Sequence, residues 1–187
     1  GVTAQTFGLD GRYDVFALRG FQSNTSSIYR DGLPLRSYQF AAWRVEPFML
    51  DRIDVVRGPT ADLYGSNEPG GVVNAVTKRP EFEDSGEVAA RAFDQGGGEI
   101  GLDFTGPLSN DVAYRAIGVF NQSGTVFDEV DQGRILFAPS VTWRPSDQAK
   151  LTVFGQYQKD EVPDSYALVP AFGSIFDNPL GQFDNDF

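Results

Sequence analysis

The chain of 187 residues is acidic and lacks two residue types on which many active sites depend. Its 26 Asp and Glu residues outnumber 15 Lys and Arg residues, and the formal net charge of −11 argues against a nucleic-acid partner. The chain contains no Cys and no His. Disulfides, Cys/His zinc sites and catalytic sites built on a thiolate or an imidazole are therefore excluded.

Hydropathy alone predicts a water-soluble protein. No stretch approaches the roughly 20 apolar residues of a membrane-spanning helix, and the chain opens without a basic-then-apolar signal segment. Transmembrane β-strands escape this test, because each needs only about 9 to 11 residues of alternating polarity. The decision between the two classes therefore depends on the period of the pattern.

Residues 1–80 predict a small α+β unit made of short strands, turns and about one helical turn. The runs 53–56 and 72–76 are apolar and β-branched enough for strands, and the helical turn is expected between them over 60–65. A longer helix candidate, 41–50, is interrupted by a proline.

Gly70 and Gly71 follow Pro69 in the loop before the second of these strands. A phosphate-binding loop is one interpretation of such a pair, since backbone amides without side chains suit an anion. The loop lacks the Lys-Ser/Thr of a P-loop and leads into a strand rather than a helix. A tight turn that needs a positive φ is the favoured interpretation.

Beyond residue 86 the chain changes to a period of two, which is typical of two-faced strands. In 132–144, Ile135 and Phe137 share an apolar face, and Arg134 begins the opposite face. Pro139 in this stretch predicts a bulge or a locally unpaired donor. The expected strands are 87–93, 99–105, 112–121, 132–144 and 151–158.

The connections between these strands alternate in length. Short turns are expected at 106–111 and 144–148, and longer, acidic, glycine-bearing loops at 123–133 and 161–187. Outer-membrane barrels have short turns at one end and long loops at the other, and Trp143 lies where an aromatic girdle would fall. A soluble antiparallel sandwich also gives alternating strands. The strands alone leave both architectures open.

Three motifs stand out in residues 1–80. The longest runs from Asp51-Arg-Ile-Asp-Val-Val-Arg-Gly-Pro59 through Leu63-Tyr-Gly-Ser66 to Pro69-Gly-Gly-Val-Val-Asn-Ala-Val-Thr-Lys-Arg-Pro80. The two shorter ones are Leu18-Arg-Gly-Phe21 and Tyr29-Arg-Asp-Gly-Leu33. In order and spacing these motifs resemble the plug domain of TonB-dependent outer-membrane receptors, in particular the siderophore branch that includes the ferrichrome receptor.

The resemblance implies an α+β plug domain over 1–80, a linker over 81–86 and the first antiparallel strands of a transmembrane β-barrel over 87–187. Plugged transporters of this kind have about 22 strands. Roughly five strands cannot close a barrel, and an open edge cannot be satisfied in lipid. The chain is therefore expected to be a fragment, incomplete at both ends, that lacks an upstream segment for contact with the TonB energy-coupling protein.

The resemblance also implies function and partners. The expected activity is TonB-dependent uptake of a ferric siderophore across the Gram-negative outer membrane, by a lipid-embedded receptor that is not an enzyme. No cofactor and no protein metal site are expected, because the siderophore itself carries the iron. One alternative is a receptor of the same architecture for cobalamin, haem or a glycan. Another is a secreted β-sandwich carbohydrate-active enzyme that uses paired carboxylates.

Six residues are candidate ligand contacts by their resemblance to outward-facing plug loops and to a barrel loop. Uncharged hydrogen-bonding groups cluster in 21–28, and stacking groups with polar handles cluster in 35–43. A solvated polar turn and a set of core aromatics remain the alternatives for these two loops. The candidates are Ser23, Asn24, Tyr38, Gln39, Phe40 and Tyr166.

Arg19 and Arg57 are candidates for a latch between plug and barrel. They belong to the Arg-Gly-Phe and Arg-Gly-Pro motifs, whose arginines pair with barrel glutamates in the family. Buried pairs are costly to break on one side, which suits a latch that must hold against force. Two exposed arginines of little energetic weight are the alternative.

Overall fold

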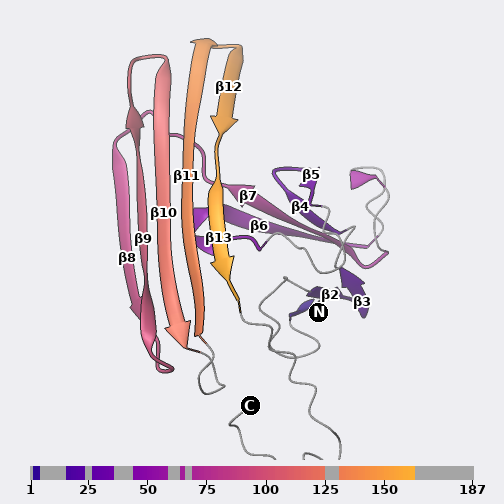
Figure 1. Ribbon diagram of the computed structural model, residues 1–187. Helices are drawn as coiled ribbons and strands as arrows, with labels where there is room; N and C mark the ends of the chain where they lie inside the picture. Colours follow the sequence, from indigo (N-terminus) through magenta and orange to yellow (C-terminus); the bar gives the residue numbers. More distant parts are fainter. Residues whose placement is uncertain are drawn as a thin grey trace, which may run out of the picture.

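The computed structural model describes residues 2–4, 16–23, 27–35, 44–58, 64–65, 69–124 and 131–162. Within these ranges the chain forms two small sheets in an N-terminal unit, and one large sheet, called the wall here, that stands beside it (Figure 1). None of the helices in the described ranges has the length and apolar composition needed to cross a membrane.

The N-terminal unit contains a three-stranded and a four-stranded sheet. The first has the order β1-β2-β3 and consists of β1 (Val2–Ala4), β2 (Phe16–Leu18) and β3 (Phe21–Ser23). The second has the order β5-β4-β7-β6 and consists of β4 (Ile28–Arg30), β5 (Leu33–Pro34), β6 (Leu50–Arg57) and β7 (Gly71–Thr77). Only the β4–β7 pair among these is parallel. The strands expected at 53–56 and 72–76 are confirmed as parts of β6 and β7.

Two glycines let β7 enter the middle of this sheet. Gly71 has a φ of +125°, which confirms the tight turn expected from the sequence. An added Cβ at Gly70 would lie only 2.3 Å from the carbonyl oxygen of Leu18. Gly71 therefore allows the positive φ, and Gly70 allows the chain to pass close to β2. Beyond the pair, Val72 and Thr77 are almost fully buried.

The helix candidate 41–50 is reduced, in its described part, to one short 3-10 turn, η1 (Pro47–Met49). Pro47 starts the turn, and the Glu46 carboxylate caps it by accepting a 3.1 Å hydrogen bond from the backbone N–H of Phe48. Leu50 is already extended and begins β6. The helical turn expected over 60–65 lies mostly outside the described residues.

The wall is an antiparallel sheet with the order β12-β11-β10-β9-β8, and β13 also pairs with β11. Its first strand begins at Ser85 and so includes the last two residues of the range expected for the linker, 81–86. The five strands expected from the sequence correspond to its successive strands, and the last of them is divided in two. The strands are β8 (Ser85–Ala92), β9 (Gly97–Pro107), β10 (Val112–Gly124), β11 (Asp131–Ser146), β12 (Ala149–Phe154) and β13 (Tyr157–Glu161).

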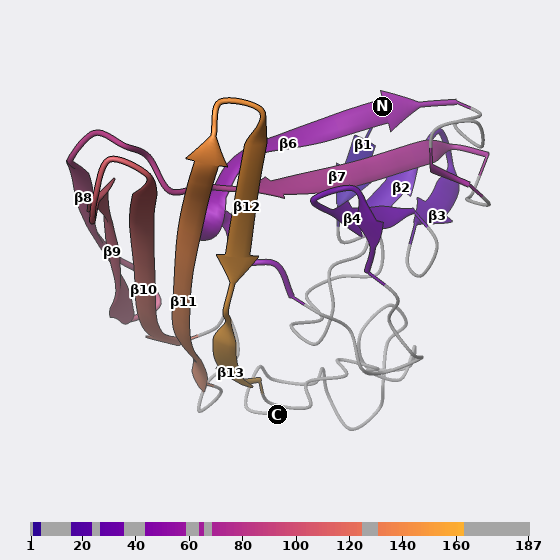
Figure 2. The same cartoon turned by 90° about the horizontal axis from the view of Figure 1, so that it is seen from above.

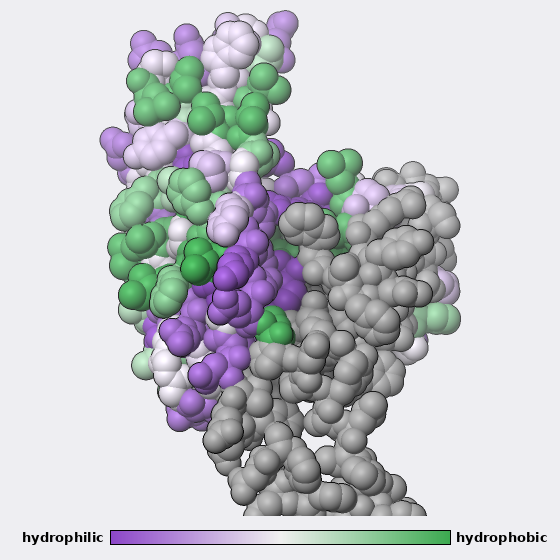
Figure 3. Space-filling view, viewed as in Figure 1, coloured by the Kyte–Doolittle hydropathy of each residue, from purple (hydrophilic) through white to green (hydrophobic). Residues whose placement is uncertain are grey.

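Exposure alternates along the wall strands. In β11, Ile135 and Phe137 are 47% and 52% exposed, whereas Leu136 and Ala138 are 2% and 7% exposed. The two expected faces are therefore confirmed, and Figure 3 shows hydrophobic side chains gathered on the wall. The exposed apolar residues of the wall's outer face are Val88, Ile100, Leu102, Phe104, Phe120, Ile135, Phe137, Val141, Trp143, Leu151, Val153 and Tyr157.

This exposed apolar face decides between the two architectures that the strands left open. A β-sandwich buries the apolar face of each sheet against a second sheet. Here the outer face of the described strands stays uncovered, while the N-terminal unit lies against the inner face. An apolar outer face with a charged, packed inner face favours barrel strands over a sandwich.

The bulge that was one expectation at Pro139 does not form at this position, and the missing donor is the N–H of Pro139 itself. Along the partner strand, Ser140 pairs with Phe154 and Phe137 with Tyr157, so the register does not shift between them. Gly155 donates a 2.8 Å hydrogen bond to the carbonyl of Pro139, which has no N–H to return. The ladder is interrupted at this point, which is where β12 ends and β13 begins.

The hydrophobic cluster of the described residues lies between the N-terminal unit and the wall. Phe48 and Met49 of η1 pack against the inner face of β10 and β11. In the view from above, β6 and β7 meet the wall at one end and extend away from it (Figure 2). We call this cluster the apolar patch, and its buried members are Phe48, Met49, Ile117, Val119, Leu136 and Ala138.

The wall has a glycine where the Phe48 ring meets it. An added Cβ at Gly101 would lie 2.9 Å from the Cε1 and Cζ atoms of Phe48. Lys78 is the first residue after β7, and its ammonium lies 4.6 Å from the centroid of the same ring. Phe48 therefore fits a socket that only a residue without a side chain leaves open.

Candidate functional site

The junction between the N-terminal unit and the wall carries charged side chains at both ends of the apolar patch. One end of the wall has the connections 108–111 and 147–148 and is called the turn end here. The opposite end has the connections 93–96 and 125–130 and is called the loop end. Each end has its own set of ion pairs.

At the loop end, one wall arginine bridges two carboxylates. Arg134 Nη1 lies 2.7 Å from Glu46 Oε2 of the N-terminal unit, and its Nε lies 2.5 Å from Asp160 Oδ1 of β13. The Arg134 and Glu46 side chains are 10% and 5% exposed. We call Glu46, Arg134 and Asp160 the loop-end bridge; its charges are withdrawn from water, where charge-assisted hydrogen bonds are strong.

Gln158 adds a backbone contact to the loop-end bridge. Its Nε2 donates to the carbonyl oxygen of Arg44 at 3.0 Å and to Asp160 Oδ2 at 2.7 Å. The segment 44–46 is therefore held to the wall by its main chain as well as by the Glu46 side chain.

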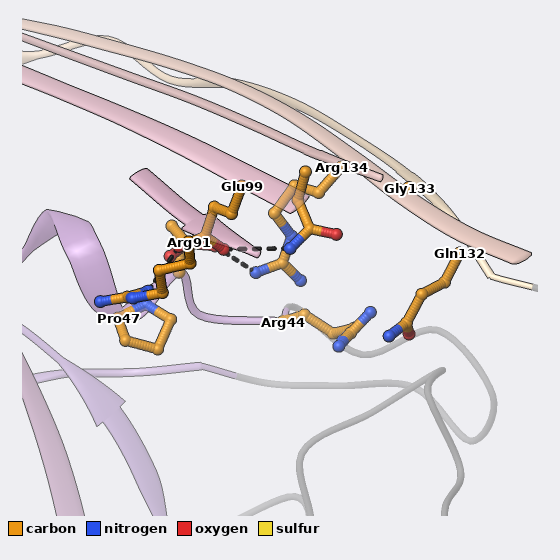
Figure 4. Close-up of a pocket in the computed structure, with 9 residues that line it drawn as sticks. Arg44, Pro47, Arg91, Glu99, Gln132, Gly133 and Arg134 are labelled. Atoms are coloured by element: carbon orange, nitrogen blue, oxygen red, sulfur yellow. Dashed lines mark hydrogen bonds and ion pairs between the residues drawn. The ribbon is translucent and has the colours of Figure 1, made fainter. Parts of the chain in front are cut away.

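A polar cavity of about 190 Å³ opens beside this bridge (Figure 4). Arg91 and Glu99, which face each other on the neighbouring strands β8 and β9 in its lining, form an ion pair with 2.5 Å between Nη1 and Oε1. The carboxylates of its lining are each paired with an arginine, and no group of three or more acidic side chains in the described ranges is placed to hold a metal ion. Its lining residues are Arg44, Glu46, Pro47, Arg91, Glu99, Asn121, Gln132, Gly133 and Arg134.

At the turn end, one wall carboxylate lies between two cations. Asp103, whose side chain is 2% exposed, accepts from Arg115 at 2.8 and 2.7 Å and from the Lys78 ammonium at 2.8 Å. Arg115 also donates to the carbonyl of Arg79 at 2.8 Å and to Glu81 at 3.1 Å. We call Lys78, Glu81, Asp103 and Arg115 the turn-end cluster.

Two further contacts join the N-terminal unit to the last wall strands. Arg30 of β4 donates to the side-chain oxygen of Gln156. Burial lowers the pKa of the Arg30 guanidinium, and Asp31, 3.8 Å away, acts in the opposite direction. The Arg79 guanidinium lies 4.6 Å from the centroid of the Phe154 ring. These contacts extend the junction across the whole width of the wall.

The structure places the two candidate latch arginines close together. Arg19 has a positive φ of 52°, and its Nη1 would lie 3.7 Å from a Cβ added at Gly58, the residue after Arg57. Within the described ranges neither arginine takes part in an ion pair with the wall. The latch role of Arg19 and Arg57 therefore stays a prediction.

The candidate ligand contacts lie almost entirely outside the described residues. Ser23 ends β3, where its backbone pairs with Phe16. Asn24, Tyr38, Gln39, Phe40 and Tyr166 are in ranges that the structure does not describe. Their roles in ligand binding stay predictions.

The residues of the loop-end bridge and the turn-end cluster were not candidates from the sequence. A signal was nevertheless present, because Arg134 lies on the inner face of β11 beside Leu136 and Ala138. Asp103 and Arg115 likewise lie on the inner faces of β9 and β10. Charged residues on the face that packs against another unit need partners. Such residues point to ion pairs across a junction.

Comparison with known proteins decides the family. A family model described as TonB-dependent Receptor Plug Domain matches residues 1–72. The ferrioxamine receptor of Yersinia enterocolitica is 36% identical over 180 residues, which cover 94% of this chain and 25% of that receptor. The ferrichrome outer membrane transporter/phage receptor of Escherichia coli K12 is 31% identical over 186 residues, which cover 97% of this chain and 25% of that protein. The chain belongs to the TonB-dependent receptors.

The fold of this TonB-dependent receptor chain agrees with solved structures of the family. The pyoverdine receptor of Pseudomonas aeruginosa PAO1 superposes with a TM-score of 0.76 at 24% identity, over 86% of this chain and 24% of that chain. The N-terminal unit is accordingly the plug, and the wall consists of strands of the outer-membrane barrel. The chain spans about a quarter of the length of the curated relatives that it matches.

Proposed function

We propose that this TonB-dependent receptor takes up a ferric siderophore across the outer membrane of a Gram-negative bacterium, with energy delivered by TonB. One observation carries the proposal. The similarity to the ferrioxamine receptor extends over 94% of the chain and so includes both the plug and the wall. A ligand taken up through a plugged barrel must be held between these two parts.

The geometry of the junction supports an energised mechanism. The wall exposes apolar side chains outward and presents charged side chains to the plug, as a wall between lipid and a plugged passage requires. Removing one partner of a buried ion pair costs roughly 3 to 5 kcal/mol. A plug held by several such pairs stays seated until work is done on it.

The proposed ligand contacts are the plug residues Ser23, Asn24, Tyr38, Gln39 and Phe40 and the wall-loop residue Tyr166. Their amide, hydroxyl and aromatic groups suit a bulky chelate that needs stacking surface and hydrogen bonds. The iron travels as cargo, ligated by the siderophore. Ferrioxamine and ferrichrome, named in the two curated relatives, are the first ligands to examine.

An uptake assay tests the proposal. The receptor is expressed in a strain without its own siderophore receptors, and iron-labelled ferrioxamine B, ferrichrome and enterobactin are offered separately, with cobalamin as a competitor. We expect accumulation of at least one ferric siderophore, and loss of that accumulation in a strain without TonB. Competition by cobalamin, with no siderophore accumulated, would contradict the siderophore assignment and leave another nutrient as cargo.

A further inference from the structure

Arg134 joins the stems of two segments that are proposed to contact the ligand. Residues 44–46 directly follow the plug segment that contains Tyr38 and Phe40. Asp160 closely precedes the wall segment that contains Tyr166. The Arg134 guanidinium contacts Glu46 at 2.7 Å and Asp160 at 2.5 Å. One side chain therefore connects the base of a plug loop with the base of a wall loop.

The contacts restrain the main chain of the plug stem, and not only its side chains. Gln158 donates to the Arg44 carbonyl oxygen at 3.0 Å, and the same amide donates to Asp160 at 2.7 Å. Glu46 also caps the 3-10 turn that carries Phe48 into the apolar patch. A shift of the stem would therefore break the bridge, the backbone contact and the cap together.

We propose that Arg134, supported by Gln158, is a positioning residue for ligand binding. It sets the spacing between the plug stem, residues 44–46, and the wall stem at Asp160, without touching the ligand itself. The inference rests on the proposed function, because it assigns the bridge a role in siderophore affinity. Loss of Arg134 leaves Glu46 and Asp160 as two neighbouring carboxylates without a cation, and like charges drive the two stems apart.

The turn-end cluster provides a matched comparison. Lys78 and Asp103 form an equally close pair across the same junction, at 2.8 Å, with side chains 17% and 2% exposed. This pair lies at the opposite end of the apolar patch, next to the connection into β8, and includes neither of the two stems that Arg134 joins. Its loss should loosen the plug without changing the spacing of the ligand loops.

The first experiment measures equilibrium binding of ferric ferrioxamine B and ferrichrome to the purified receptor and to three variants. For Arg134→Met we expect affinity to fall about tenfold or more, which corresponds to about 1.4 kcal/mol. Arg134→Lys keeps the positive charge but lacks the several fixed donors of the guanidinium, and it should recover part of the lost affinity. Lys78→Met should stay within about twofold of the wild type. Heat-modifiable mobility in gels confirms that each barrel is folded.

The second experiment needs no ligand and therefore separates this inference from the proposed function. Because these 187 residues contain no Cys, nitroxide labels can be attached at Gln39→Cys and Tyr166→Cys in a receptor in which any Cys elsewhere is replaced by Ser. Their distance distribution is then measured by pulsed electron paramagnetic resonance. Arg134→Met should broaden or lengthen this distribution, whereas Lys78→Met should leave it unchanged.

The outcomes distinguish the two claims. An unchanged distance distribution in Arg134→Met overturns the positioning role, as does an affinity that falls equally in Arg134→Met and Lys78→Met. A wild-type receptor that binds no ferric siderophore while the distances respond as expected overturns the proposed function and leaves the positioning of the two loops intact.

Discussion

The two ends of the plug–wall junction use opposite charge arrangements and different chain connections. At the loop end, the wall cation Arg134 lies between two carboxylates, and its plug partner Glu46 is 88 residues away in sequence. At the turn end, the wall carboxylate Asp103 lies between two cations, and its plug partner Lys78 is 25 residues away. The two ends therefore hold the plug in different ways.

This difference bears on what each end can do when its ion pairs break. Near the turn end, the chain passes from Lys78 into β8 through a short connection, so the plug and the wall stay close together without any ion pair. At the loop end, noncovalent contacts alone keep segment 44–46 against the wall. These contacts must offset the entropy cost of closing the 88-residue stretch between Glu46 and Arg134. The two ends therefore differ in how far the plug can move away from the wall once their ion pairs break.

The largest expected effect on stability belongs to Asp103 of the turn-end cluster. Asp103→Ala removes the buried carboxylate that Lys78 and Arg115 share and leaves them only the exposed carboxylates of Glu87 and Glu81. We expect the free energy of unfolding to fall by roughly 3 to 5 kcal/mol. Urea unfolding of the receptor in lipid vesicles measures this change. Glu87→Gln is the matched control, since Glu87 is also paired with Lys78 but is 59% exposed. Equal losses in both variants would show that burial does not govern the turn end.

Phe48→Ala should have the next largest effect, because it removes the aromatic ring from the apolar patch that lies between the two ends. Truncation of a buried Phe costs about 3 kcal/mol or more. We expect faster cleavage of the plug by protease and leakage of small ions in planar bilayers. Leu33→Ala is the control, since Leu33 is 71% exposed on the plug. A plug that resists protease equally in both variants would remove the apolar patch from the seating mechanism.

Gly101→Leu should disturb the same contact from the wall side. A Cβ at this position already lies within 2.9 Å of the Phe48 ring, so a larger side chain displaces the plug at a cost of about 1 to 3 kcal/mol. The double variant with Phe48→Ala tests the reason, because removal of the ring should make room for the leucine. If the losses of stability from Gly101→Leu and Phe48→Ala simply add in the double variant, the Phe48 ring does not limit the size of the side chain at position 101.

The smallest expected effect belongs to Arg52, which calibrates the others. Its ion pairs with Asp51 and Asp54, at 3.0 and 3.1 Å, are as short as the Arg115–Glu81 pair of the junction, at 3.1 Å, but its side chain is 58% exposed. Arg52→Met should change the free energy of unfolding by about 1 kcal/mol or less. A loss as large as that of Asp103→Ala would mean that pair geometry, and not burial, decides the stability of this plug.

The faces of the wall were predictable from the sequence because they depend on local order. A period of two places Ile135 and Phe137 opposite Leu136 whatever strand lies beside them. Pro139 predicts a missing hydrogen-bond donor for the same reason, because its ring removes the backbone N–H whichever strand lies beside it. The turn at Gly71 also depends on its own backbone and not on distant partners.

The junction was not predictable, because it depends on register and docking. The contact between Glu46 and Arg134 requires that η1 meet β11 at one position along the strand, and no local sequence pattern determines that position. The latch prediction for Arg19 and Arg57 assumed that the plug supplies the cation. At the loop end the described structure shows the reverse polarity, with the carboxylate on the plug and the arginine on the wall.

The socket at Gly101 limits the directions in which the plug can travel. On the inner face of β9, the neighbours of Gly101 are Glu99 and Asp103, each two residues or about 7 Å away along the strand. A plug that slid along β9 in either direction would carry the Phe48 ring out of the gap at Gly101 and onto a charged side chain. The contact at Gly101 therefore restrains the plug against sliding along the wall. A pulling force frees this part of the plug by first lifting the Phe48 ring away from the wall.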